Sequence, residues 1–389
     1  MTNYQDTGFI YNVYVYPKIP VDASVPSVTK QVAKGTTNNF GQSADIHSIN
    51  NEVATWKITS DNLPASISEY NSYVFTDVVD ERLVPDTSSV VVKYKDASDA
   101  EKTMTAKTDY TAVWTVVAEK YNKVVVTLTK AGIGKLEAGK SVFFTYTTTI
   151  NTEKAGSVAQ IIGNHVILDY KNSADVTGKV DNTPSRSDDD SFDPDNPSKW
   201  PETVVPNPDY DPTKPDDETD NPPTITIKTP SNPGDELGKD DPYVWTGKIE
   251  GLKTNNAATP APLSGAKFTL YTDAACTTKA AGTLEVETGA NGKFSFIGLE
   301  KGTYYLLETK APNGYELNGT PTKIEIVSPL TADQTATRAT AVSVTIKNIP
   351  STKLPVTGGM GVGMFAVVGA VLAAAGVVLM NKSRKAKAC

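Results

Sequence analysis

Short runs of alternating apolar and polar residues dominate this sequence and limit the folds open to it. Between about residues 25 and 176, turn residues separate these runs, and few segments carry a helical period. The clearest runs are YVFTDVV, SSVVVKY, VVVTLT, SVFFTYTTTI and HVILDY. Such short strands with frequent turns predict an Ig-like β-sandwich. A second β-rich block, residues 242–350, predicts a second sandwich in tandem, so the chain is expected to be all-β.

A stretch of different composition separates the two blocks. Residues 181–241 are dominated by Asp, Pro and Asn, as in SDDDSFDPDNPSKW and DPTKPDDETDNPP. Such a segment buries too little apolar surface to offset the entropy that it would lose on ordering. It is therefore expected to be a stiff, extended, acidic linker.

The composition argues against several functions. The 389 residues carry a net charge of −8, which argues against nucleic acid as a partner. The only histidines are His47 and His165, and the only cysteines are Cys276 and Cys389. A Cys/His metal cluster is thereby excluded, and no cofactor is expected. No constellation of substrate-facing residues stands out, so we do not expect an enzyme that acts on other molecules.

The C-terminal end carries a predicted membrane span. Residues 360–380 form an uncharged, apolar run whose length as a helix is roughly 30 Å, one hydrocarbon core. The basic residues after this run are Lys382, Arg384, Lys385 and Lys387. They predict a cytoplasmic tail, with the rest of the chain outside the cell. No apolar leader follows Met1, so the sequence is expected to be an N-terminally truncated, exported protein.

The pentapeptide LPVTG begins at Leu354 and directly precedes the predicted span. Pentapeptide, span and basic tail, in this order, resemble the cell-wall sorting signal of Gram-positive surface proteins, here residues 351–389. The resemblance implies that a sortase cysteine attacks the Thr357 carbonyl and releases the chain from Gly358 onward. Pro355 favours an extended conformation, and Gly358 leaves the scissile bond unhindered. The helix would then hold the chain in the membrane only until the chain is joined to peptidoglycan or to another subunit.

A tyrosine-rich strand near the N-terminus ends in a lysine. In YNVYVYPK, Tyr14, Tyr16 and Lys18 share one face of the predicted strand, which by itself describes a solvated lysine. Beside a sorting signal, the segment resembles the pilin motif of sortase-assembled pili, V-x-V-Y-P-K. The resemblance implies that the Lys18 amine attacks the acyl-enzyme formed at Thr357 of another subunit. Residues 1–22 would be the last strand of a missing N-terminal pilin domain.

The second β-rich block contains a longer motif. Residues 304–315, YYLLETKAPNGY, complete the pattern Y-x-L-x-E-T-x-A-P-x-G-Y, with LSGAKFTLY upstream at 263–271. Together they resemble the CnaB-type, SpaA-like pilin domain with its E-box, expected here over residues 242–350. These domains form a spontaneous Lys–Asn isopeptide bond inside the sandwich, and the resemblance implies that Glu308 is the acid of that reaction.

Strand periodicity points to the same site independently. Asn348 lies in phase with an apolar row that includes Val344 and Ile346, and Lys253 lies in phase with Ile249. Burial makes a lysine lose its proton more easily and a glutamic acid keep its proton more easily. Neutral Lys253 would then be a nucleophile, and protonated Glu308 could polarise the Asn348 carboxamide. The competing Lys248 falls on the opposite face, and a buried polar cluster without chemistry remains an alternative.

The first sandwich, expected over residues 23–180, repeats these elements. Lys30 is in phase with neighbouring valines, Asp77 with Phe75, and Asn164 with the apolar row of IIGNHVILDY. These shorter motifs resemble the isopeptide-forming fimbrial D2 domain, a CnaA-like fold, with Asp77 as the catalytic acid. The two bonds would close loops of roughly 95 and 135 residues and, by analogy with disulfides, stabilise by a few kcal/mol each.

Two functional hypotheses remain. The first is a structural shaft subunit of a covalent, wall-anchored pilus, whose partners are pilin and housekeeping sortases, related subunits and peptidoglycan. The second is a single-copy wall-anchored adhesin or ancillary pilin that uses LPVTG but not Lys18. Both place the protein on the cell surface, where host surface ligands are further candidate partners.

Overall fold

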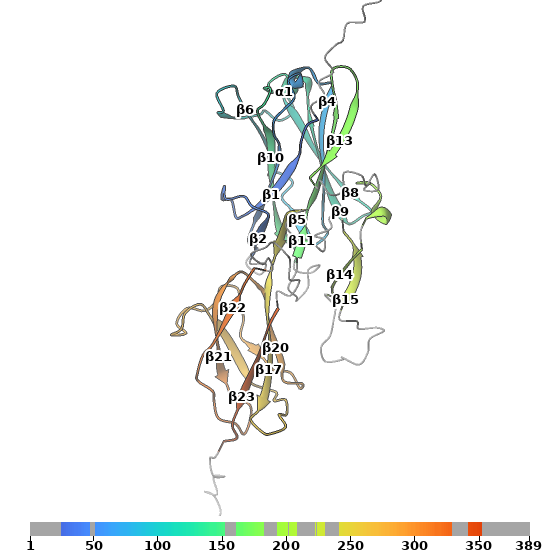
Figure 1. Ribbon diagram of the computed structural model, residues 1–389. Coiled ribbons are helices and arrows are strands. Elements are labelled where there is room, and N and C mark those ends of the chain that lie inside the picture. The colour runs from blue at the N-terminus through green and yellow to red at the C-terminus, as the bar shows by residue number, and fades with distance from the viewer. Residues whose placement is uncertain are drawn as a thin grey trace, which may run out of the picture.

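The structure is a computed structural model. It describes residues 25–46, 51–151, 161–182, 193–200, 202–207, 222, 224–229, 241–328 and 341–351. These residues fold almost entirely into β-strands, so the prediction of an all-β protein is confirmed. Two blocks of strands lie end to end (Figure 1). Lys18, the LPVTG pentapeptide and the predicted membrane span lie outside the described residues. Within those residues no helix is long and apolar enough to span a membrane.

The N-terminal block consists of two antiparallel sheets. The order of the first is β1 (Thr29–Lys34), β3 (Ala54–Ser60), β10 (Val142–Ile150), β6 (Val91–Lys95) and β7 (Glu101–Thr103), with β5 (Leu83–Pro85) paired to β10. The order of the second is β13 (Thr177–Asp181), β12 (His165–Lys171), β4 (Ser72–Val79), β9 (Tyr121–Leu128) and β8 (Tyr110–Val117). Two short helices, η2 (Ile67–Glu69) and α1 (Lys130–Ile133), lie between strands.

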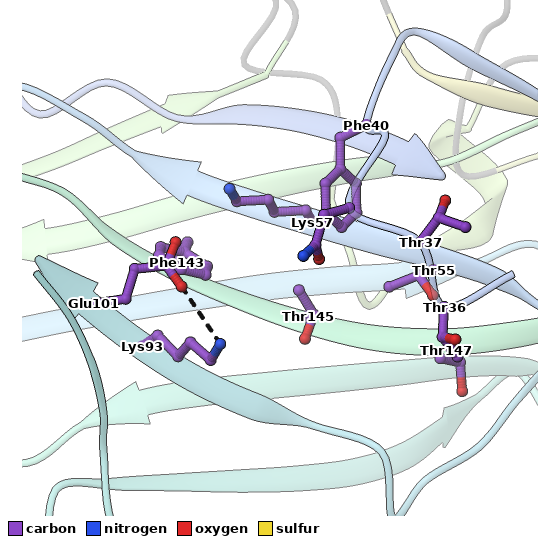
Figure 2. A pocket seen from close by; sticks show the side chains of 11 residues that line it. Thr36, Thr37, Phe40, Thr55, Lys57, Lys93, Glu101, Phe143, Thr145 and Thr147 are labelled. Atoms are coloured by element: carbon purple, nitrogen blue, oxygen red, sulfur yellow. Dashed lines mark hydrogen bonds and ion pairs between the residues drawn. The ribbon is translucent and has the colours of Figure 1, made fainter. Parts of the chain in front are cut away.

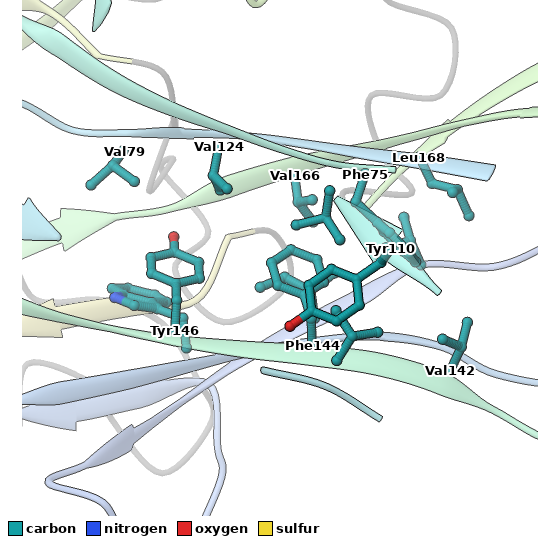
Figure 3. Close-up of a cluster of buried hydrophobic side chains, with 14 of the residues drawn as sticks. Phe75, Val79, Tyr110, Val124, Val142, Phe144, Tyr146, Val166 and Leu168 are labelled. Carbon is teal, nitrogen blue, oxygen red and sulfur yellow. The ribbon is translucent and has the colours of Figure 1, made fainter. Parts of the chain in front are cut away.

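The core of this block lies between the two sheets. Phe144 on β10 and Phe75 on β4 meet across it, with ring centroids 5.4 Å apart. Figure 3 shows that aromatic residues of β10 face the aliphatic residues of the opposite sheet, among them Val124 and Val166. Alternation along each strand places these side chains inside, as the sequence pattern predicts.

The C-terminal block also has two sheets. The smaller has the order β20 (Lys293–Leu299), β17 (Gly247–Asn255) and β23 (Ala341–Asn348), and β17 and β23 run parallel. The larger has the order β19 (Val286–Glu287), β18 (Lys267–Tyr271), β21 (Gly302–Lys310) and β22 (Thr322–Ile326). Phe268 and Phe294 stack between the sheets at 4.2 Å, and Gly251 makes room for the Phe294 ring, since a Cβ there would lie 2.0 Å from it.

A short three-stranded sheet joins the two blocks. In it β16 (Tyr243–Trp245) lies between β11 (Ile161–Gly163), which is antiparallel to it, and β2 (Ser43–Asp45), which is parallel to it. Lys34 adds ion pairs to Glu300 of the C-terminal block and, at 3.4 Å, to Asp45. The strand that leads into the second block is therefore hydrogen-bonded to the first.

The acidic interval contains regular structure that the sequence analysis did not anticipate. Strands β14 (Glu202–Pro206) and β15 (Thr224–Lys228) pair as an antiparallel ribbon, preceded by the short helix η4 (Pro197–Lys199). Trp200 is 1% exposed and packs on Tyr121 of β9, with ring centroids 4.6 Å apart. The expected extended linker is thus wrong for these residues, because Trp200 supplies apolar surface that docks them on the first sandwich.

Candidate functional site

The C-terminal sandwich brings Lys253, Glu308 and Asn348 together. Lys253 lies on β17 and Asn348 ends the neighbouring parallel strand β23, where the register pairs Lys253 with Ile346. Asn348 is two residues beyond that partner, so its side chain lies on the same face. Glu308 reaches the pair from β21 of the opposite sheet.

The three side chains form a closed set of polar contacts. Lys253 Nζ donates a hydrogen bond to Asn348 Oδ1 and lies 3.0 Å from Glu308 Oε1. Asn348 Nδ2 donates to both Glu308 oxygens at 3.0 Å. The backbone N–H of Asn318 donates to Glu308 Oε2 at 2.7 Å and fixes the carboxyl group. The arrangement places an amine beside a carboxamide whose nitrogen already contacts an acid.

Burial sets the electrostatics of this site. The exposed fractions of Lys253, Glu308 and Asn348 are 0%, 3% and 2%. Loss of hydration lowers the pKa of Lys253, and Glu308 partly opposes that shift. The competing Lys248 instead pairs with Glu250 at 2.6 Å. Lys253 is thus the lysine with access to the buried carboxamide.

The N-terminal sandwich brings Lys30 into contact with Asp77 and with the backbone of His165, the residue after Asn164. Lys30 Nζ on β1 lies 2.5 Å from Asp77 Oδ2 on β4 and also donates to the His165 carbonyl oxygen at 3.4 Å. Asn164 lies between β11 and β12 and is fully buried. Burial lowers the pKa of Lys30 to about 8, although Asp77 opposes the shift, and burial raises the pKa of Asp77.

Tyr146 is a member of this site that the sequence analysis missed. Its hydroxyl donates to Asp77 Oδ2 at 3.0 Å and accepts a hydrogen bond from Asn164 Nδ2 at 2.6 Å. Tyr146 is fully buried on β10, and Figure 3 shows its hydroxyl reaching toward the opposite sheet. A tyrosine on the inward row of SVFFTYTTTI was a usable signal, because a buried phenol needs a hydrogen-bond partner.

A second buried polar group adjoins Asn164. His165 Nδ1 lies 2.9 Å from Asp241 Oδ1, which also accepts a hydrogen bond from Asn182 Nδ2 at 2.8 Å. The Asn164 backbone N–H donates to the Pro242 carbonyl at 3.0 Å. These contacts fasten the residues before β16 beside the first site, a connection between distant segments that no local motif signals.

An open groove of about 470 Å³ lies on the outer face of the first sheet and is separate from both sites. Thr145 and Thr147 line it and alternate along β10 with inward-facing Phe144 and Tyr146. Figure 2 shows the groove with the Lys93–Glu101 ion pair along it. Neither cluster of buried polar residues opens into this groove.

Known proteins resemble this chain over most of its length. Residues 247–341 match the SpaA family, described as a prealbumin-like fold domain. The chain is 27% identical over 418 residues to fimbrial subunit type 1 of Actinomyces viscosus, covering 99% of this chain and 68% of that protein. The region matched to SpaA includes Lys253 and Glu308 and ends before Asn348.

Solved pilin structures are also similar. The major pilin subunit BcpA of Bacillus cereus shares 19% identity, covering 84% of this chain and 71% of that one, with a TM-score of 0.46. The 35 kDa C-terminal fragment of the major pilin GBS80 of Streptococcus agalactiae shares 19% identity, covering 84% and 100%, with a TM-score of 0.48.

Proposed function

Since this chain is a relative of Gram-positive pilin subunits, we propose that it is a shaft subunit of a covalently polymerised pilus, stabilised by self-formed Lys–Asn bonds. The observation that carries the proposal is the buried contact among Lys253, Glu308 and Asn348. This contact holds the Lys253 amine beside the Asn348 carboxamide, away from water, with the Glu308 carboxyl group next to both.

The reaction at the second site follows from these contacts. The neutral Lys253 amine attacks Cγ of Asn348, the new N–Cγ bond forms, and the Cγ–Nδ2 bond breaks. Protonated Glu308 gives its proton to Nδ2 and takes the proton that the lysine nitrogen gives up, so ammonia leaves and the acid is regenerated. Each molecule performs this step once, on itself, and needs no oxidant or cofactor.

The first site supports a second bond, between Lys30 and Asn164, with Asp77 as the acid. Its lowered lysine pKa, about 8, allows a substantial neutral fraction near physiological pH. Together the bonds would tie the early strands of each sandwich to late ones. A chain closed in this way resists extension under tension, which suits the shaft of a surface fibre.

Assembly and anchoring would use residues outside the described part of the chain. Lys18 of one subunit would attack the sortase acyl-enzyme formed at Thr357 of another, so that an amide joins subunits head to tail. The segment from Leu354 to Gly358 would be the sortase substrate, and the last subunit would be joined to peptidoglycan.

Intact-mass spectrometry of the folded full chain tests the internal bonds. Each bond removes one ammonia, about 17 Da, so two bonds lower the mass by about 34 Da. Variants Asn164→Ala and Asn348→Ala should each retain one loss, relative to their own calculated masses. The full unmodified mass for the wild type would refute both bonds.

Incubation with a cognate pilin sortase tests assembly separately. A shaft subunit gives ladders of high molecular mass that Lys18→Ala abolishes, while Lys34→Ala, the matched control, leaves them intact. Sortase cleavage without ladders would instead identify a single-copy adhesin or ancillary pilin.

A further inference from the structure

The acid and the carboxamide are connected differently in the two sites. Glu308 contacts Asn348 Nδ2 directly, at 3.0 Å from each carboxyl oxygen. Asp77 makes no hydrogen bond to Asn164 in the described part of the chain, and Asp77 Oδ1 and Asn164 Oδ1 are both buried without a partner there. The hydroxyl of Tyr146 lies between the two groups and is hydrogen-bonded to both.

We propose that Tyr146 is a catalytic residue of the first cross-link, which carries a proton between Asp77 and the departing nitrogen of Asn164. The inference rests on the proposed Lys30–Asn164 bond and adds to it a group that contacts the reacting amide. It deepens the account of that site, because the acid alone has no path to the leaving group.

The proton path is continuous and balanced. Asp77 Oδ2 is the shared atom, since it lies 2.5 Å from Lys30 Nζ and 3.0 Å from the Tyr146 hydroxyl. When the Lys30 amine adds to Cγ of Asn164, its nitrogen passes one proton to Asp77 Oδ2. Nδ2 is no longer an amide in this adduct and becomes a proton acceptor. Tyr146 then gives its proton to Nδ2 and receives the one held by Asp77, the Cγ–Nδ2 bond breaks, and ammonia leaves.

The surroundings of Tyr146 suit a relay and disfavour a free phenolate. Its ring packs against Trp114, with centroids 5.6 Å apart, and against Phe144, at 6.3 Å. Burial, with Asp77 nearby, raises the pKa of Tyr146 well above its ordinary value, so the phenol keeps its proton at rest. A phenol that is neutral before and after the step can accept and donate a proton in one event.

The test follows both cross-links after the denatured, unlinked full chain is refolded by dilution. The variant is Tyr146→Phe, and the matched control is Tyr73→Phe, a fully buried tyrosine of the same core whose hydroxyl bonds Ser60 Oγ at 2.6 Å. Peptide mapping by mass spectrometry separates the Lys30–Asn164 link from the Lys253–Asn348 link. The second link is an internal control in every molecule.

The expected result is that Tyr146→Phe slows the first link by about 100-fold or more, the range of general acid–base catalysis, while the second link keeps its rate. Tyr73→Phe should leave both rates within about threefold of the wild type, because that hydroxyl is outside the proton path. A first-link rate in Tyr146→Phe equal to that of Tyr73→Phe would overturn the role of Tyr146. Absence of the first link in the wild type would instead overturn the proposed bond itself.

A near-isosteric replacement covers the case in which Tyr146→Phe does not fold, as judged by near-ultraviolet circular dichroism. Site-specific 3,5-difluorotyrosine at position 146 keeps the ring and hydroxyl but makes the phenol more acidic. A relay predicts that the first-link rate and its pH profile change, while a packing role predicts no change. An unaltered rate and profile would overturn the inference even if the phenylalanine variant is unstable.

Discussion

In the C-terminal sandwich, Lys253 and Asn348 lie on neighbouring strands of one sheet, and Glu308 comes from the sheet opposite. In the N-terminal sandwich the lysine is the partner from the other sheet. Lys30 lies on β1, whereas Asp77 lies on β4, next to the β12 strand that follows Asn164.

This difference decides which contacts are direct. An acid from the opposite sheet can face the lysine and the carboxamide together, as Glu308 does. An acid on the strand beside the asparagine points across the core to the lysine, and Asp77 is also one methylene shorter than a glutamate. Tyr146, from the sheet of the lysine, spans the remaining gap. The proposed linking reaction would therefore use three side chains in one geometry and four in the other.

The largest expected effect concerns mechanical extension of the full chain held by its two ends. Asn348→Ala opens a loop of 95 residues between Lys253 and residue 348, which should add about 32 nm of contour length at ~3.4 Å per residue. Asn164→Ala should add about 45 nm, because its loop is longer. Both variants keep the lysine–acid pair, so no buried charge in either sandwich is left without its partner.

Single-molecule force spectroscopy measures these increments. The wild type is the control and should show neither of them below the force that breaks a covalent bond. Equal increments in the two variants, or either increment in the wild type, would contradict the assignment of the two loops.

Shortening the acid of the second site should slow its reaction strongly. Glu308→Asp withdraws the carboxyl group by about one bond length, and a misplacement of about 1 Å can cost about 100-fold in rate. Within the described residues, no hydroxyl is hydrogen-bonded to Asn348 that could bridge the gap as Tyr146 does. Refolding followed by mass spectrometry gives the rate, and Glu287→Asp, at an exposed position on β19, is the matched control. A wild-type rate in Glu308→Asp would show that direct contact is unimportant.

The sequence predicted the members of the second site because each one interrupts a regular inward row. Lys253, Glu308 and Asn348 lie where strand alternation calls for apolar side chains, and the structure brings all three together. Lys30 and Asp77 were found in the same way and are in contact. Local periodicity reveals which face a side chain is on. The roles expected of Glu308 and Asp77 came from the resemblance to isopeptide-forming pilin domains.

Other features depended on long-range order that one sequence does not reveal. Tyr146 can bond both Asp77 and Asn164 only because β10 lies opposite β4. From the sequence, its position on the inward face of a strand indicates only an ordinary core residue. The contact of His165 with Asp241 joins residues 76 positions apart across an acidic interval that composition assigned to an extended linker. The contact of Trp200 with Tyr121 was missed as well, because the average composition of a segment does not show that one of its residues packs on another part of the chain.

Linking at both sites should slow as the pH falls, because burial lowers the pKa of both lysines. The pKa of Lys30 is lowered to about 8, and only the neutral amine attacks, so the first-link rate falls as pH drops below 8, by about tenfold per unit, and levels off above it. The pKa of Lys253 is also lowered by burial, so its link likewise slows as pH falls. Refolding at pH 5.5 to 9, with peptide-resolved mass spectrometry, gives both profiles. A first-link rate that is constant below pH 7 would contradict attack by the neutral lysine.

The smallest expected effect tests whether the junction between the two blocks contributes to the difference between the two sites. Lys34 pairs with Asp45 and Glu52, each at 3.4 Å, and with Glu300 of the C-terminal block. Its side chain is one-third exposed, so solvent screens these pairs, and Lys34→Ala should cost about 1 kcal/mol or less. Calorimetry should show a shift in unfolding temperature of about 2–4 °C at most, with both linking rates unchanged.

Lys93→Ala is the matched control for Lys34→Ala, because its pair with Glu101 at 3.4 Å lies on the first sandwich alone. If Lys34→Ala altered one linking rate and Lys93→Ala did not, the contrast between the sites would depend on how the blocks are joined. Equal, small effects of both variants would show that the contrast arises inside each sandwich. It would then depend on which group comes from the opposite sheet, the lysine in the first sandwich and the acid in the second.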